Sequence, residues 1–297
     1  MVEFSIVCPI KDEVDLIPRT LPSFYAVNPS EVVLCLDKPA PKHVIGVIEK
    51  VAEACKAGNM TRIIEVVRNP EYAYHQAWVR RKGFMEAKHC RILTTDIDLV
   101  INRNVLKAVE MVGNDDIGLV SLNKFRYPNS LIRFLRLLGT GILQKYVRFF
   151  AEAYRGRGIA ATTFTGLYAI WRDHWLDSEP QEELKKLKSS KTALRQGEKV
   201  VWDSDIVRAT GEDTFLRDHM EVKHKVVYLP DIGGYVLTDP MEDLPVVQFK
   251  KGIYFCLSGR NLLGALARTV FRLQPYYLCG HLYGRKLAKS RKMGSKL

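Results

Sequence analysis

The sequence predicts an α/β fold built on a parallel β-sheet, and two observations support this prediction. Short apolar runs rich in Val, Ile and Leu alternate with segments of helical length through the first 120 residues. Buried parallel strands have this composition, and the alternation is typical of a sheet wound by right-handed crossovers. The chain has 297 residues, of which 47% are hydrophobic and 26% charged, so it can bury the core of a globular protein.

The expected elements follow one another in a regular order, with apolar runs as strands and longer amphipathic patterns as helices. We expect strands at residues 4–10, 31–37, 62–67, 91–97, 117–125, 162–171, 225–230 and 233–238. We expect helices at residues 14–27, 40–57, 74–88 and 102–112, with a further helix starting in residues 211–220. Residues 178–200 are strongly polar and are interpreted as a surface helix or a mobile loop.

The net charge of +12 is concentrated in two stretches of the chain. Residues 244–297 contain eleven Lys and Arg and no acidic residue, which leaves a net charge of only +1 on residues 1–243. Residues 124–157 contain eight Lys and Arg and a single acid, Glu152. Such concentration indicates a polyanionic partner, which would be membrane phospholipid, a phosphorylated substrate or nucleic acid.

Both basic stretches are also rich in Leu, Ile and Phe, which is typical of amphipathic helices at a membrane interface. We therefore expect a catalytic domain at residues 1–243 with an amphipathic insertion at about 127–157. Residues 244–297 would form a basic amphipathic appendage that associates with a membrane. A helix packed on the catalytic domain or in a dimer interface is the alternative for each segment. No uncharged apolar run reaches the roughly 18 residues of a membrane span.

The cysteines and the first residues of the chain predict a cytoplasmic location. The six cysteines are scattered without a CxxC pair, and several lie in apolar runs, so we interpret them as reduced core thiols. The first residues run directly into a strand and lack the charged start and long apolar stretch of a signal peptide.

Acidic residues gather at the ends of the expected strands. Asp12 and Glu13 follow the first strand, Asp37 ends the second, and Asp96 and Asp98 come after RILTT of the fourth. Ligands of open α/β sheets bind beyond these carboxyl ends. In a strand Asp96 and Asp98 would point to the same side, where two like charges need a positive partner. A helix cap or turn former is the alternative for each acid taken alone.

A series of short motifs resembles the family 2 glycosyltransferases, over roughly residues 3–240. The motifs are PIKDE at 9–13, Asp37, VRRKGF at 79–84, TTDIDLV at 94–100, TFTGLYAIWR at 163–172 and GEDTFL at 211–216. Asp12 and Arg81 depart from the Asn that is usual in the family. The resemblance implies the GT-A fold of nucleotide-diphospho-sugar transferases, a Rossmann-like sheet with helices on both faces.

The same resemblance implies a metal-dependent, inverting transfer of a sugar from a UDP- or GDP-sugar. The residues implied in donor binding are Pro9, Asp12, Glu13, Asp37, Arg80 and Asp96. Asp98 would hold Mn²⁺ or Mg²⁺, with Asp96 contacting the metal, its bound water, the sugar or the ribose. Such an ion bridges the two phosphates of the donor and stabilises the leaving group. Asp213 would be the catalytic base, although GEDT also resembles a helix N-terminus, and Gly166 and Glu212 would lie on the acceptor side.

The amphipathic insertion lies on the acceptor side in this family, which favours a lipid acceptor such as a polyprenyl phosphate or a lipid headgroup. The protein would then contact the cytoplasmic face of a membrane peripherally. One alternative is a soluble glycosyltransferase with a small phosphorylated or polysaccharide acceptor. A basic nucleic-acid-binding protein is disfavoured, because the basic segments are rich in Leu and Phe and carry no nucleic-acid motif. A nucleotidyltransferase is disfavoured because PIKDE lacks glycine.

Several other side chains are interpreted as packing residues, although aromatic rings also stack on sugars. They are His75, Trp78, Trp171, Trp202 and His219.

Overall fold

The structure is a computed structural model of the chain. It describes residues 2–69, 75–125, 166–178, 223–237, 262–271 and 273–294, with positions 138, 142, 220, 245, 248–249, 252–253 and 256. The chain forms two compact units. The first comprises Met1–Arg126, Thr163–Ser189 and Gly211–Thr238, and the second comprises Tyr127–Thr162, Ser190–Thr210 and Asp239–Leu297.

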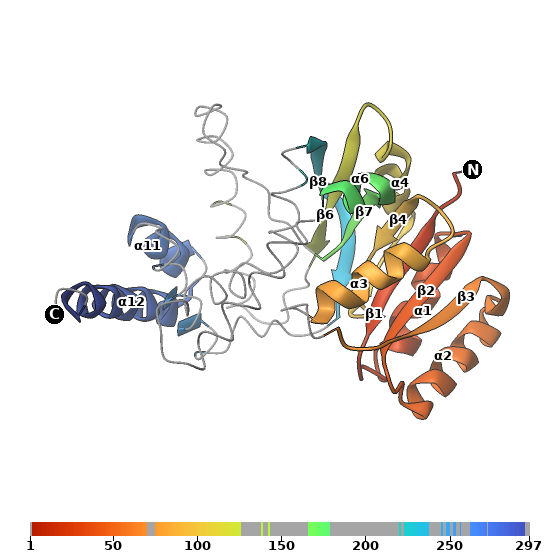
Figure 1. Ribbon diagram of the computed structural model, residues 1–297, viewed down its shortest axis with the longest axis horizontal. Helices are drawn as coiled ribbons and strands as arrows, with labels where there is room; N and C mark the ends of the chain where they lie inside the picture. The colour runs from red at the N-terminus through yellow and green to blue at the C-terminus, as the bar shows by residue number, and fades with distance from the viewer. Residues whose placement is uncertain are drawn as a thin grey trace. The chain divides into compact units, whose positions relative to one another are not determined.

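The first unit is built on a sheet whose eight described strands have the order β3-β2-β1-β4-β7-β6-β8-β5 (Figure 1). The strands are β1 (Ser5–Ile10), β2 (Glu31–Asp37), β3 (Thr61–Val66), β4 (Arg91–Thr94), β5 (Leu99–Val100), β6 (Ile117–Phe125), β7 (Tyr168–Trp171) and β8 (Lys225–Val236). Strands β3, β2, β1 and β4 are parallel, whereas β7 runs antiparallel between β4 and β6. The predicted α/β sheet is confirmed, and it is mixed rather than wholly parallel.

Helices cover both faces of this sheet, as expected. They are α1 (Ile17–Ala26), α2 (Lys42–Ala54), α3 (His75–Glu86), α4 (Leu106–Met111) and α6 (Arg172–Ser178). The buried residues of α1, α2 and α4 share one core with the Ile6, Cys8 and Leu34 side of the strands. The residues of α3 and α6 share a second core with the Val7 and Cys35 side. Successive strand residues alternate between the faces, so one run of apolar residues supplies both cores.

Helix α1 shows why these segments fold as they do. Its buried residues Ile17, Thr20, Leu21 and Phe24 recur at intervals of three and four, which places one apolar stripe on the sheet. The described helices are shorter than their predicted ranges by one to three residues at most ends. The predicted helix 102–112 divides into a 3₁₀ turn, Arg103–Val105, and α4.

Helix α3 lies unusually close to β1 and β2 because of one glycine. A Cβ added to Gly83 would lie 2.4 Å from Cγ1 of Val7 and 2.7 Å from Sγ of Cys35. No larger residue fits between the helix and the two strands. The close approach brings the N-terminal half of α3, including Arg80, against the carboxyl ends of the strands.

Two strand predictions are wrong. The predicted strand 91–97 ends at Thr94, so Asp96 and Asp98 do not belong to it. The predicted strands 225–230 and 233–238 form the single strand β8. The register with β6 jumps from Leu122 opposite Leu229 to Asn123 opposite Gly233, so the interruption is an enlarged bulge rather than a turn.

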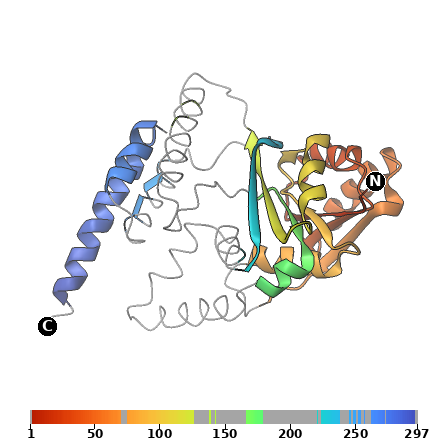
Figure 2. The same cartoon turned by 90° about the horizontal axis from the view of Figure 1, so that it is seen from above.

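The second unit contains α11 (Leu262–Phe271) and α12 (Pro275–Gly294), which contact each other and are blue in Figure 2. Helical residues near position 250 also pack against α12, and two glycines allow this close approach. A Cβ on Gly280 would lie 1.9 Å from the carbonyl oxygen of Phe249, and one on Gly252 would lie 2.0 Å from that of Tyr277. In the described part of the chain, no helix combines the length and the apolar character needed to cross a bilayer. The predicted roles of residues 1–243 and 244–297 stay predictions.

The expectation of core thiols is confirmed for Cys8 and Cys35 and is wrong for Cys279, which is exposed. All six are free, and Cys8 and Cys35 are fully buried in the two faces of the sheet. Burial raises the pKa of both thiols, so they stay protonated and unreactive.

Candidate functional site

The turn after β1 is held by the carboxylate of Glu13. Its Oε2 accepts hydrogen bonds from the backbone N–H groups of Lys11, at 2.9 Å, and Asp12, at 3.2 Å. The side chain of Asp12 is exposed beside this turn, and Pro9 belongs to β1, opposite Cys35 of β2. Glu13 therefore fixes the turn, while Asp12 faces outward.

At the end of β2, Asp37 pairs with the first residue of α3. The Nε2 atom of His75 lies 2.7 Å from Oδ1 of Asp37, and 44% of the Asp37 side chain is exposed. The pair ties the start of α3 to the strand end. His75 is therefore a polar partner of a predicted donor-site acid and not only a packing residue.

The centre of the site is an ion cluster of Arg80, Asp96 and Lys124. Nη2 of Arg80 donates to Oδ1 of Asp96, and Nζ of Lys124 donates to Oδ2 across 2.6 Å. Only 3% of the Arg80 side chain and 19% of the Lys124 side chain are exposed. The sequence alone did not indicate Lys124; its signal is a lysine near the end of a mostly apolar strand, β6.

This cluster supplies the positive partner that Asp96 needs. Burial by itself raises the pKa of the Asp96 carboxyl, but the charges of Lys124 and Arg80 and their hydrogen bonds outweigh it. The pKa of Asp96 is therefore lowered, and the carboxylate is ionised at neutral pH. Two cations on one carboxylate leave the cluster with a net positive charge.

Asp96 and Asp98 lie in a turn between β4 and β5. The N–H of Leu99 donates to the carbonyl of Asp96 at 3.1 Å, and the N–H of Leu237 donates to the carbonyl of Asp98 at 2.8 Å. These two residues are not in a strand, so the expectation that both side chains point to the same side does not apply. Asp96 contacts Arg80 and Lys124 from this turn.

Gly166 lies directly against the ion cluster. A Cβ added to Gly166 would lie 2.5 Å from Oδ2 of Asp96 and 3.2 Å from Nη2 of Arg80. Any other residue here would displace the ion pair. Glycine thus allows the backbone before β7 to approach the cluster.

The predicted metal ligands fit an ion to different degrees. Carboxylate oxygens suit Mn²⁺ and Mg²⁺. Both oxygens of Asp96, however, already bind cations of the protein. The half-buried Asp98 is therefore the better fit for a metal ion. Asp96 instead holds Arg80 and Lys124.

The structure thus brings Arg80, Asp96 and Gly166 into contact, and it places the other described candidates at the same edge. Pro9, Asp12, Glu13 and Asp37 lie at or after the ends of β1 and β2. Glu212 and Asp213, on the predicted acceptor side, lie outside the described residues, as do Trp202, His219 and residues 179–200.

Protein-family models give no match to the sequence, and a search of curated proteins gives none either. Among solved structures, the mannosyltransferase PcManGT from Pyrobaculum calidifontis, in complex with GDP-Man and Mn²⁺, is 14% identical with a TM-score of 0.51, over 99% of this chain and 75% of that chain. S. aureus TarS (residues 1–349) is 13% identical with a TM-score of 0.45, over 91% of this chain and 72% of that chain.

A third solved structure is 4-diphosphocytidyl-2C-methyl-D-erythritol synthase from Anaerococcus prevotii. It is 12% identical with a TM-score of 0.43, over 84% of this chain and 94% of that chain. At such identities a likeness shows the fold alone. With the mixed sheet covered by helices on both faces, the likeness to PcManGT shows that the chain has the GT-A-like α/β fold.

Proposed function

We propose that the protein is a glycosyltransferase that uses a nucleotide-sugar donor, a UDP- or GDP-sugar. The ion cluster of Arg80, Asp96 and Lys124 is the observation that carries this proposal. It lies at the carboxyl ends of the strands, where open α/β sheets bind their ligands. Its net positive charge, fixed on buried side chains, suits the diphosphate of a nucleotide-sugar.

Each residue at this edge has a task in such a transfer. Asp96 holds Arg80 and Lys124 in place, so that both cations stabilise the charge of the departing nucleoside diphosphate. Asp37, which pairs with His75 at the end of β2, would bind the donor's base. Asp98 would hold Mn²⁺ or Mg²⁺, which would supply Lewis-acid stabilisation of the diphosphate.

On the acceptor side, we assign the base to Asp213 and acceptor contacts to Glu212 and Gly166. Asp213 would take the proton of an attacking hydroxyl, which gives inversion at the sugar carbon. An acceptor phosphate is already anionic and needs no strong base. Asp213 would then orient the acceptor.

The donor site is tested by thermal unfolding with UDP-, GDP- and dTDP-sugars, with and without Mn²⁺. One nucleotide class should raise the melting temperature, more with Mn²⁺, because a ligand at a hundred times its Kd stabilises by about 2.7 kcal/mol. Asp98→Asn should lose the added effect of Mn²⁺. Asp115→Asn, at the opposite strand ends, is the matched control and should respond as wild type.

Two outcomes would contradict different parts of the proposal. If no nucleotide-sugar stabilises the chain, the donor-site assignment fails. If Asp98→Asn keeps the full response to Mn²⁺, the donor assignment stands but Asp98 does not hold the metal.

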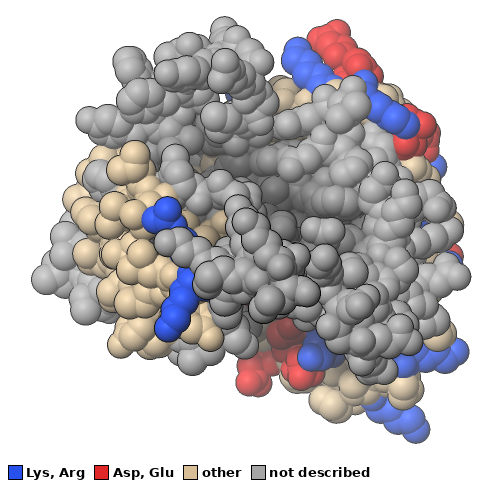
Figure 3. All heavy atoms as spheres, turned by 60° about the vertical axis from the view of Figure 1, so that its left-hand side comes forward, with Lys and Arg blue, Asp and Glu red and all other residues tan. Residues whose placement is uncertain are grey.

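The surface of the second unit supports an acceptor at a membrane. Helix α11 exposes 73% of Leu263 and 64% of Val270, and α12 exposes about half of Tyr276, Leu282 and Tyr283. Figure 3, with the α11–α12 side turned forward, shows uncharged surface among which basic side chains lie. Residues 244–297 contain no acid, so this surface is complementary to an anionic lipid layer, to which each nearby Lys or Arg contributes about 1 kcal/mol.

Two isolated positions of the insertion agree with this interpretation. Leu138 and Ile142 are helical residues one turn apart, and both are exposed. Peripheral contact with the cytoplasmic face of a membrane would present a lipid-linked acceptor, such as a polyprenyl phosphate or a lipid headgroup.

Vesicle flotation tests this part of the proposal. The full chain should float with phosphatidylcholine vesicles that contain phosphatidylglycerol and not with pure phosphatidylcholine. Leu263→Asp combined with Val270→Asp should weaken binding by about tenfold per lost side chain. Val67→Asp, equally exposed in the first unit, should float as wild type.

Other flotation results would point to other acceptors. A wild-type chain that stays in solution favours the soluble alternative, with a small phosphorylated or polysaccharide acceptor. A dimer that the double substitution breaks, without vesicle binding, would mark the α11–α12 face as an interface between copies.

A further inference from the structure

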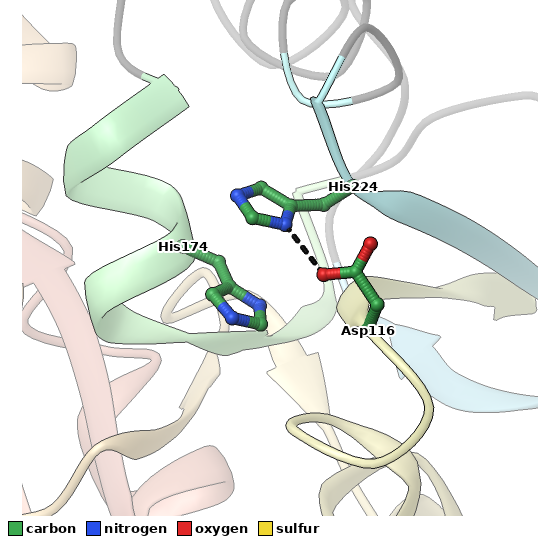
Figure 4. Close-up of side chains that lie close together, drawn as sticks. All are labelled: Asp116, His174 and His224. Carbon is green, nitrogen blue, oxygen red and sulfur yellow. Dashed lines mark hydrogen bonds and ion pairs between the residues drawn. The ribbon is translucent and has the colours of Figure 1, made fainter.

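A second group of ligand-type side chains lies at the opposite edge of the same sheet (Figure 4). Asp116 directly precedes β6, His224 directly precedes β8, and His174 lies in α6 after β7. Because β7 runs antiparallel to β6, and β8 runs parallel to it, the three positions meet at one edge. The length of β6 separates them from Lys124 by more than about 20 Å, at a rise of about 3.4 Å per residue.

The three side chains already lie at ligand spacing. One ligand atom from each of Asp116, His174 and His224 lies within 4.8 Å of the others. Nδ1 of His224 lies 2.8 Å from Oδ1 of Asp116, and the two imidazole rings stack with centroids 4.0 Å apart. Ligand atoms about 2.1 Å from a tetrahedral zinc ion lie roughly 3.4 Å from one another, which is close to the spacing here. The two rings are nearly parallel, at 9°, so one of them must turn for both nitrogen lone pairs to reach the same ion.

The surroundings hold His224 in a fixed place. A Cβ on Gly118 of β6 would lie 2.9 Å from Cβ of His224, so the histidine packs directly on the strand backbone. Its other nitrogen, Nε2, lies 3.7 Å from Oδ2 of Asp177, one turn after His174 in α6. A carboxylate behind the second ring nitrogen is the usual partner of a metal-binding histidine.

One ring nitrogen of this group needs a partner. Nδ1 of His174 is a buried atom that makes no hydrogen bond among the described residues. A buried nitrogen without a partner destabilises the folded protein, and a bound cation would offset that cost.

We propose that Asp116, His174 and His224 bind a divalent transition-metal ion such as Zn²⁺, with Asp177 orienting the ring of His224. Imidazole nitrogen with one carboxylate oxygen suits Zn²⁺, Ni²⁺ or Co²⁺, whereas Mg²⁺ and Ca²⁺ take oxygen ligands. The ion would join β6, α6 and β8 across 108 positions of sequence, and so would stabilise this half of the sheet. This site is distinct from the Asp98 edge and does not depend on the proposed sugar transfer.

The test is titration of the metal-free full chain with Zn²⁺, followed by calorimetry and thermal unfolding. One equivalent should bind at this site and raise the melting temperature, and excess Mg²⁺ should not displace it. His174→Ala and Asp116→Asn should weaken Zn²⁺ binding by at least about tenfold. Asn is tolerated at position 116, whose φ is +60°, so this variant should fold.

Two controls separate this site from others. His43→Ala removes an exposed histidine of α2, and Asp98→Asn alters the opposite edge; both should bind Zn²⁺ as wild type. The proposal would be overturned if Asp116→Asn and His174→Ala bind Zn²⁺ as wild type. It would also be overturned if His43→Ala loses Zn²⁺ binding to the same extent as those variants. A wild-type chain that Zn²⁺ does not stabilise would overturn it as well.

Discussion

Replacing Asp96 with Asn is expected to abolish stabilisation by a nucleotide-sugar and to lower the free energy of unfolding by about 3 kcal/mol. Arg80 is 3% exposed, and the carboxylate of Asp96 contacts both Arg80 and Lys124. An amide cannot balance these cations as a carboxylate does, so the buried guanidinium of Arg80 loses an ion-pair partner. Urea unfolding would measure the stability, and thermal unfolding with the donor would measure binding. Asp115→Asn serves again as the control and should change neither.

The contribution of Asp96 to the free energy of unfolding should decrease at low pH. Its pKa is lowered in the folded protein relative to the usual value of about 3.9. The stability that it contributes is therefore fully present above that value and is lost as pH falls through the folded pKa. The difference in unfolding free energy between wild type and Asp96→Asn should stay constant from pH 7 to about pH 5 and shrink below about pH 4. A difference that disappears near pH 6 would show that Asp96 is not held as an ionised partner.

Gly166→Ala tests the same cluster without changing a charge. The added methyl group would lie 2.5 Å from Oδ2 of Asp96, so the carboxylate must move from Lys124 or Arg80. Donor stabilisation should fall although every ionisable group remains. If Gly166→Ala binds the donor as wild type, the exact placement of the cluster does not matter for binding.

Gly233→Ala is expected to destabilise the first unit by about 3 kcal/mol. The new Cβ would lie 1.8 Å from the backbone oxygen and 2.6 Å from the backbone carbon of Asn123, and backbone atoms cannot rotate away. Strands β6 and β8 would have to separate where Asn123 pairs with Gly233, next to Lys124. Urea unfolding measures the loss, and donor stabilisation should fall with it.

Gly46→Ala is the matched control for this substitution. Gly46 lies inside α2, and a Cβ there would meet nothing within 4 Å. Since alanine is the better helix former by about 0.8–1.0 kcal/mol, this variant should be slightly more stable than wild type. Equal stability of the two variants would show that β6 and β8 do not pair in this register.

The sequence predicted the part of the fold whose signals are local. Val- and Ile-rich runs of strand length, separated by helical segments, indicated β1 to β4 and the helices between them. The predicted boundary after β4 was wrong because Asp96, Ile97 and Asp98 keep the alternation of a strand while the Leu99–Asp96 hydrogen bond closes a turn. The bulge in β8 was missed because Pro230 and Asp231 are also common in turns.

The sequence likewise predicted only some residues of the candidate site. Acids at strand ends and the motifs around Asp96 identified one edge of the sheet from sequence alone. Lys124 comes from a strand 28 positions after Asp96, and nothing near it in the sequence indicates a site. Asp116 and His224 are 108 positions apart, and their meeting depends on the pairing of β6 with β8.

By itself, then, the sequence determined which segments become strands and helices, and which acids stand at strand ends, because these properties follow from neighbouring residues. The tertiary structure alone decided that Arg80 and Lys124 share one carboxylate, and that two histidines stack beside Asp116. Strand order and register decide which distant side chains meet, and they are set by packing of the whole sheet rather than by any local pattern.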